Sequence, residues 1–181
     1  PVFTGMTTNK YFQIVMSMLF ICLSTSVSFA LSVNDPAPLF SLRDSSGDIF
    51  FLSDYVGAGK KQSCKGVILN FFSSTCKPCK KELPVLNSLV DEFNKKGIKV
   101  VIIGHKENFD KFMDMLEELK VDKPIILGDP YGKTSDKYGV YGLPVTVFIG
   151  SDAKVKFIIK GESFEMEKIL REKAGQLLKA K

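Results

Sequence analysis

The hydrophobic residues of this chain fall into short continuous runs that alternate with longer stripes at helical spacing. The runs are rich in Val, Ile and Phe, and they occupy residues 49–52, 67–72, 98–103, 125–127, 145–149 and 155–159. Continuous apolar runs of this length are typical of strands that are buried on both faces of a sheet. We therefore expect a central sheet that lies between layers of other elements.

Two segments within the chain have the spacing of amphipathic helices. The first begins after Cys76 and carries apolar residues at intervals of three and four as far as Phe93. Pro84 should kink this helix, and Gly97 should end it. The second helix is expected from the apolar stripe over residues 109–119.

A last helix is expected over residues 162–179, with Ser163 as its N-cap. Five apolar side chains are available to pack it: Phe164, Ile169, Leu170, Leu177 and Leu178. Among the connecting segments, we expect an extended segment at 35–40 and a turn at 45–48. We also expect a polar loop at 57–66 and a helical turn at 134–138. This order of elements predicts an α/β fold, a three-layer α/β/α sandwich around a mixed sheet.

The first 30 residues differ in composition from the rest of the chain. They contain one basic residue, Lys10, and no acidic residue, and an apolar stretch leads to Ser28-Phe29-Ala30. This order is typical of a secretory signal peptide with a cleavage site after Ala30. An uncleaved membrane anchor is the alternative, although the stretch is shorter than the ~20 residues that span a bilayer. We interpret residues 1–5 as a tag remnant or gene-model artefact and residues 31–181 as one domain.

The charge of the chain gives no sign of a surface that binds nucleic acid. The formal net charge is +5, and the basic residues are dispersed or in short clusters such as Lys60-Lys61. These clusters lack interleaved aromatic residues, so they are better explained as solvated lysines than as a nucleic-acid surface. We expect no nucleic-acid partner.

The candidate chemistry lies between the run at 67–72 and the helix that follows, where Cys76-Lys77-Pro78-Cys79 forms a CxxC motif. A CxxC in this position is typical of a dithiol/disulfide redox centre. Cys76 would lie at the helix start, where unpaired N–H groups and the helix dipole favour a thiolate. Nearby lysines add positive charge with the same effect, and Cys79 lies close enough to close a disulfide ring. The motif therefore predicts thiol–disulfide exchange.

Three other uses of a CxxC motif are disfavoured. A structural zinc site needs two further ligands, but Cys22, Cys64 and His105 have no ligand-like spacing. Covalent haem attachment needs a His directly after the second cysteine, where Lys80 stands. A peroxidatic cysteine would be preceded by a Pro and a Thr, but Leu69 and Ser73 stand at those positions before Cys76. We expect no metal and no cofactor.

Pro144 begins a core strand, although a proline cannot donate to the hydrogen-bond ladder. One explanation is a trans proline at a strand edge. The other is a cis-proline loop that faces the CxxC motif and presents the backbone of Leu143 to an extended peptide. We expect the cis form.

Two further polar residues need an account. Without Cys22 the mature chain has three cysteines, an odd number that leaves one unpaired or intermolecular. We expect Cys64 to be an incidental thiol of the polar loop, with a regulatory or dimer-forming disulfide as the alternative. We expect His105 to be a solvated loop histidine.

The segment 67–84, VILNFFSSTCKPCKKELP, resembles the TlpA/ResA-like branch of the thioredoxin superfamily. The similarity covers roughly residues 33–178 and includes the entry at 37–42, the loop at 142–146 and an insertion at 105–128. It implies a thioredoxin-like fold, with the CxxC at a helix N-terminus and an inserted helix–strand unit. It also implies a thiol–disulfide oxidoreductase.

The resemblance implies that Cys76 is the attacking thiol and Cys79 the resolving thiol, with Pro144 beside them. It implies disulfide-containing exported proteins, such as apocytochrome c, as substrates, and a membrane thiol donor of the DsbD/CcdA kind. The expected location is the periplasm or another extracytoplasmic space, with a membrane tether if the leader stays uncleaved. A thiol oxidant or isomerase is one rival function; a non-catalytic adaptor or a haem or copper delivery module is another.

At four further positions, the residue of this chain either matches or departs from the pattern of the branch. Asn70 stands where thioredoxin itself has a buried acid, and Glu82 matches an acid that is proposed to tune thiol protonation. An exposed glutamate that is favoured by the helix dipole is the alternative for Glu82. Thr75 and Phe72 replace tryptophans that are common in the branch, which leaves the choice of partner open.

Overall fold

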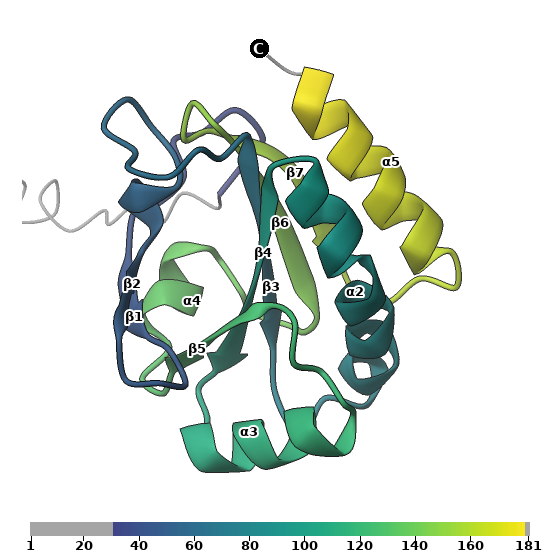
Figure 1. Cartoon of the computed structure of the whole chain (residues 1–181). Helices are drawn as coiled ribbons and strands as arrows, with labels where there is room; N and C mark the ends of the chain where they lie inside the picture. Colours follow the sequence, from purple (N-terminus) through teal and green to yellow (C-terminus); the bar gives the residue numbers. More distant parts are fainter. Residues whose placement is uncertain (1–30, 180–181) are drawn as a thin grey trace, which may run out of the picture. The chain divides into compact units, whose positions relative to one another are not determined.

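A mixed sheet of five strands forms the centre of the computed structural model, which describes residues 31–179; the predicted leader lies outside the described residues. The strands are β3 (Gly66–Phe72), β4 (Ile98–His105), β5 (Ile125–Asp129), β6 (Val145–Gly150) and β7 (Val155–Lys160). They lie in the order β5-β4-β3-β6-β7, as Figure 1 shows. The strands β3, β4 and β5 are parallel, whereas β6 and β7 are antiparallel to their neighbours. The expected mixed sheet is confirmed.

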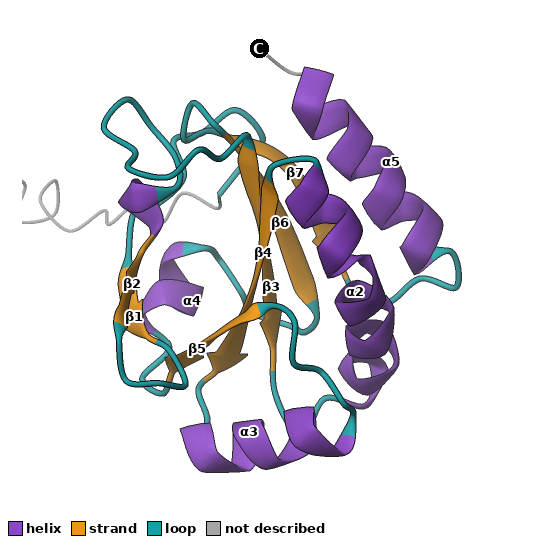
Figure 2. Ribbon diagram, viewed as in Figure 1, coloured by secondary structure: helices purple, strands orange, loops and turns teal. Residues whose placement is uncertain are grey.

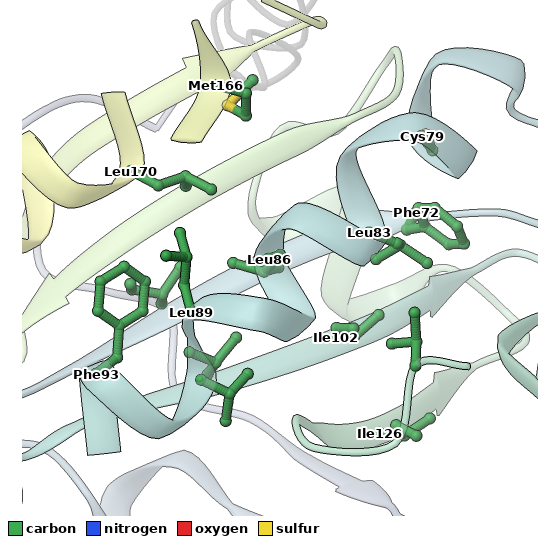
Figure 3. Packing of buried hydrophobic residues seen from close by; sticks show 14 of the residues in the cluster. Phe72, Cys79, Leu83, Leu86, Leu89, Phe93, Ile102, Ile126, Met166 and Leu170 are labelled. Atoms are coloured by element: carbon green, nitrogen blue, oxygen red, sulfur yellow. The ribbon is translucent and has the colours of Figure 1, made fainter. Parts of the chain in front are cut away.

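Three helices cover one face of this sheet: α2 (Lys77–Lys95), α3 (Phe109–Glu118) and α5 (Met166–Lys179). Their apolar side chains form one cluster with the inward residues of the strands, and Figure 3 shows Leu83, Leu86 and Leu89 of α2 within it, with Leu83 beside Phe72. The helix α2 continues through Pro84, whose side chain is exposed, and ends before Gly97. Gly97 has a φ of 82°, a left-handed conformation that costs glycine little.

The opposite face is covered by a hairpin of β1 (Ser41–Arg43) and β2 (Ile49–Phe51), the short helix η1 (Leu52–Asp54) and α4 (Lys133–Lys137), as Figure 2 shows. Phe40, Phe50 and Tyr138 pack together here, with ring centroids 5.9 and 6.1 Å from Phe40. The strand β1 was not expected, because its sequence Ser-Leu-Arg is short and polar. These elements complete the predicted three layers.

The last helix differs from the expectation at its start. It begins at Met166 rather than at residue 162, and the Ser163 hydroxyl accepts a hydrogen bond from the Glu165 N–H in the preceding turn. Phe164 lies in that turn and is fully exposed, so its predicted role in packing was wrong. The residues that α5 does bury follow one helical stripe, and they are Met166, Leu170, Ala174 and Leu177.

Within residues 31–179 no helix combines the length and the hydropathy that crossing a bilayer requires.

A close contact at the start of β3 gives a test of this packing. A Cβ atom on Gly66 would lie 2.7 Å from Leu177 Cδ2 and 2.9 Å from the backbone oxygen of Ile149. Gly66→Ala should therefore lower the free energy of unfolding in urea by about 1–3 kcal/mol, the usual cost of overpacking. Gly59→Ala is the matched control, because a Cβ there meets no atom within 4 Å. Equal stability of the two variants would contradict the packing of α5 against β3.

Candidate active site

Cys76 and Cys79 form a disulfide at the start of α2, with their Cα atoms 5.3 Å apart. Cys76 is the N-cap residue and has an extended backbone, with φ −82° and ψ 102°. Pro78 lies in the first turn, where a missing N–H leaves no helical hydrogen bond unmade. The Cys76 side chain is half-buried, while Cys79 is fully buried. An incoming nucleophile or disulfide therefore has better access to Cys76 than to Cys79.

The turn between β3 and α2 presents Cys76. The Cys76 N–H donates to the Ser73 carbonyl at 3.1 Å, which closes the turn. The Ser73 and Thr75 hydroxyls lie 3.1 Å apart in a further hydrogen bond. The Glu107 carboxylate accepts hydrogen bonds from Ser74, a contact that was not anticipated from the sequence. Thr75 itself is exposed, so no bulky side chain covers the approach to the disulfide from this position.

The Leu143–Pro144 peptide bond is cis, as expected. Strand register places it beside the motif, because Val145 pairs with Phe71 and β3 ends at the next residue, from which the turn leads to Cys76. Pro144 is buried, and its carbonyl accepts a hydrogen bond from the Gly161 N–H at 2.9 Å. Leu143 is half-buried and packs against the clusters on both faces of the sheet. The cis-proline loop and the disulfide thus meet at one edge of the sheet.

A buried polar group lies behind the disulfide. Glu82 is only 5% exposed, which excludes the alternative of an exposed first-turn glutamate. The side-chain amide of Asn70 donates to Glu82 Oε1 at 2.9 Å and to Thr146 Oγ1 at 2.8 Å. The Thr146 hydroxyl in turn donates to Glu82 Oε1 at 3.2 Å. Thr146 was not predicted, although a polar residue two positions after the cis proline, within an apolar run, was the available signal.

Burial changes the acidity of Glu82. It raises the pKa of this carboxyl from its ordinary value of 4.5 to about 7, although the hydrogen bonds from Thr146 and Asn70 favour the charged form. Glu82 follows Cys79 by three residues, so both side chains lie on the same face of α2. The site therefore contains a group that can take up or release a proton near neutral pH on the side of the buried cysteine.

A groove of about 320 Å³ opens next to the motif. Pro78, Glu82 and Val85 of α2 line one side, and residues 162–164, 166 and 167, before and at the start of α5, line the other. Lys81 lies 3.9 Å from Glu162 across it, and both side chains are largely exposed. Lys77 and Lys80 are exposed as well, so water screens the positive charge that these lysines contribute.

Cys64 and His105 lie outside this site. Cys64 is unpaired, which agrees with the expectation of an incidental thiol. Cys64 is only 3% exposed and belongs to a buried apolar cluster. Its thiol donates to the Gly66 carbonyl at the start of β3, at 3.0 Å. A buried thiol is shielded from a partner chain, which disfavours a dimer-forming disulfide. His105 ends β4 and is half-buried rather than solvated. Among the described residues, no three His, Cys, Asp or Glu side chains gather as a metal site.

The raised pKa of Glu82 predicts how stability depends on pH. Between pH 4.5 and 7 the unfolded chain releases this proton while the folded chain retains it, so the free energy of unfolding should fall as pH rises. The full loss is roughly 3 kcal/mol. Glu82→Gln should remove that loss, so the variant should match the parent near pH 4.5 and exceed it at pH 8 in urea unfolding. The exposed Glu162→Gln is the control. A parallel pH profile for parent and Glu82→Gln would contradict the raised pKa.

Comparison with known proteins agrees with this geometry. Residues 33–158 match the model of the AhpC/TSA family. The thiol-disulfide oxidoreductase ResA of Geobacillus thermodenitrificans is 36% identical over 135 residues, which cover 73% of this chain and 71% of the relative. ResA of Bacillus subtilis is 32% identical over 75% of this chain and 72% of its own length.

A solved structure has the same fold over nearly its full length. It is a putative thiol:disulfide interchange protein DsbE from Chlorobium tepidum, with a TM-score of 0.72 and 27% sequence identity. The alignment covers 82% of this chain and 99% of that structure. The fold, the disulfide at the start of α2 and these relatives together show that the chain belongs to the AhpC/TSA family of the thioredoxin superfamily, as a ResA-like thiol–disulfide oxidoreductase.

Proposed function

We propose that this protein is an exported reductant of disulfides in other exported proteins. The observation that carries the direction is the burial of Glu82 on the face of α2 that also carries Cys79. A strong oxidant such as DsbA owes its potential to a stabilised reduced form. Here an ionised carboxylate would repel a thiolate, while the lysines around the motif are exposed to solvent. Such a site favours the disulfide form, which is the property of a reducing couple.

The proposed reaction transfers two electrons in two steps. The Cys76 thiolate attacks one sulfur of a substrate disulfide, and the other substrate sulfur leaves as a thiolate. Cys79 then loses its proton and attacks the Cys76 sulfur, which releases the second substrate sulfur and closes the Cys76–Cys79 disulfide. Glu82 is the group that would accept the Cys79 proton. The products are a substrate dithiol and the oxidised protein.

The cis-proline loop supplies the contact for the substrate in this proposal. An extended chain would pair with the backbone at Leu143 as an added strand, next to Cys76. Asn70 would support Glu82 from below, and Pro78 with the adjoining groove would contact the chain that flanks the substrate cysteine. Thr75 leaves this approach open.

The cellular setting belongs to the same proposal. The composition of residues 1–30 supports export through a signal peptide, which would place the protein in the periplasm or another oxidising, extracytoplasmic space. A reductant there needs a source of electrons, and a membrane thiol donor of the DsbD/CcdA kind would re-reduce Cys76–Cys79. The ResA-like relationship supports apocytochrome c as one substrate.

The potential of the couple tests the direction of electron flow. Equilibration of the purified protein with glutathione or dithiothreitol buffers should give a value near the thioredoxin end of the scale, about −270 mV. A value near the −120 mV of DsbA would reverse the direction, and would favour the oxidant or isomerase alternative. Cys76→Ser in the same buffers controls for the thiols that remain, Cys64 and Cys79.

Trapping of partners tests the roles of the two cysteines. Cys79→Ser lacks the resolving thiol, so it should accumulate mixed disulfides through Cys76, and these should include an exported CxxC protein and a membrane thiol donor. Cys76→Ser should trap neither, and Cys64→Ser combined with Cys79→Ser should trap both as before. Partners that are instead linked through Cys79 or Cys64 would overturn the assignment of Cys76 as nucleophile.

A further inference from the structure

We propose that Glu107 is a positioning residue for the nucleophile, because its carboxylate fixes the turn that presents Cys76. The inference concerns the thiol–disulfide exchange at Cys76 and does not depend on the direction of electron flow. Glu107 lies 31 positions after Cys76 and belongs to the segment between β4 and α3.

The contacts converge on one residue of the turn. The Ser74 N–H donates to both carboxylate oxygens of Glu107, at 3.0 and 2.9 Å. The Ser74 hydroxyl donates to Oε2 of the same carboxylate at 2.5 Å. Hydrogen bonds to an ionised acceptor are about twice as strong as those between neutral groups. Glu107 is half-buried, so water competes less for them than at a fully exposed site.

The position of Ser74 makes this contact matter for Cys76. The turn 73–76 is closed by the bond from the Cys76 N–H to the Ser73 carbonyl, and Ser74 is its second residue. That internal bond leaves the Ser74 N–H for a partner outside the turn, and Glu107 supplies it. The carboxylate thereby sets the orientation of the peptide units that lead into the N-cap of α2.

The sheet brings the two segments together. The strands β3 and β4 are parallel neighbours, and Phe72 at the end of β3 pairs with Gly104 near the end of β4. Loops that leave the carboxyl ends of adjacent parallel strands meet at the same edge of the sheet. The loop 106–108 therefore reaches the turn 73–76, although the two are far apart in the chain.

The segment that carries Glu107 is itself anchored on both sides. Lys106 has a φ of 51°, an uncommon conformation for a residue with a side chain. Its N–H donates to the Asp129 carbonyl at 3.1 Å, and its ammonium group lies 2.8 Å from Asp136. On the other side, Asn108 Oδ1 caps α3 by accepting from the Asp110 N–H at 2.9 Å. Because the backbone on both sides of Glu107 is fixed, its carboxylate loses little conformational freedom when it binds Ser74. A residue that positions a catalytic group needs this rigidity.

The experiment compares Glu107→Ala and Glu107→Gln with the exposed control Glu118→Gln of α3. Reduced protein is alkylated with iodoacetamide at fixed pH, and the rate at Cys76 is read from its peptide by mass spectrometry. The reduction of insulin disulfides is measured in parallel, with dithiothreitol as the reductant that regenerates the dithiol. Glu107→Ala should slow alkylation of Cys76 and lower kcat about tenfold, with KM changed by less than about twofold, because a displaced nucleophile loses alignment. Glu107→Gln keeps a neutral acceptor for the Ser74 N–H and should regain most of the loss.

Stability measurements separate positioning from a general structural role. Urea unfolding of the reduced variants shows whether each is folded under assay conditions. Ser74→Ala, which keeps the backbone contacts, provides a milder second variant. A tenfold loss in folded Glu107→Ala, with rescue in Glu107→Gln, supports the proposal. Rates in Glu107→Ala that match the Glu118→Gln control overturn it. Equal losses in Glu107→Ala and Glu107→Gln that follow the loss of folded protein overturn it as well.

Discussion

The pairing of β3 on both of its sides is the constraint on which the site depends. Parallel pairing with β4 and antiparallel pairing with β6 fix three chain segments at one edge of the sheet. The end of β3 leads to Cys76, the end of β4 leads to Glu107, and the start of β6 carries the cis Pro144. Every residue of β3 is buried, so a shift in its register would expose apolar surface on both faces and is disfavoured. The geometry around the disulfide follows from this one strand.

The same strand brings polar groups into the core, where they are costly unless they are hydrogen-bonded. Asn70 faces the α2 side of the sheet, and there its amide joins Glu82 and Thr146 from two other elements. The network links the CxxC helix to the strand that follows the cis proline. A well-packed apolar core would avoid this cost, so the network is best understood as the means by which the site holds an ionisable group beside a buried cysteine.

Much of this arrangement could be predicted from the sequence, because it depends on strong local signals. The CxxC after an apolar run indicated the position of the redox helix, and Leu143-Pro144 before another run indicated the cis proline. The burial of Glu82 could not be predicted, since a glutamate in the first turn is equally expected on the surface. Whether it is buried depends on the rotation of α2 against the sheet, which is set by long-range packing.

The residues that were missed share the same cause. Glu107 and Thr146 act through partners 33 and 64 positions away, and no local pattern encodes such pairings. Phe164 was assigned to the core because it is apolar, but it precedes the first turn of α5 and so lies off the buried stripe. The burial of Cys64 was not anticipated, because its polar neighbours in the sequence give no sign that the thiol lies within an apolar cluster.

The buried position of Cys64 has a consequence for the chemical fidelity of the protein. Cys64 belongs to the apolar cluster on one face of the sheet, and Cys79 to the cluster on the other. A disulfide exchange that joined Cys64 to Cys76 or Cys79 would require the hydrogen-bonded strands between them to separate. The sheet thus separates the redox-active Cys76–Cys79 pair from the thiol of Cys64. Exchange between Cys64 and the Cys76–Cys79 pair is therefore not expected while the chain stays folded.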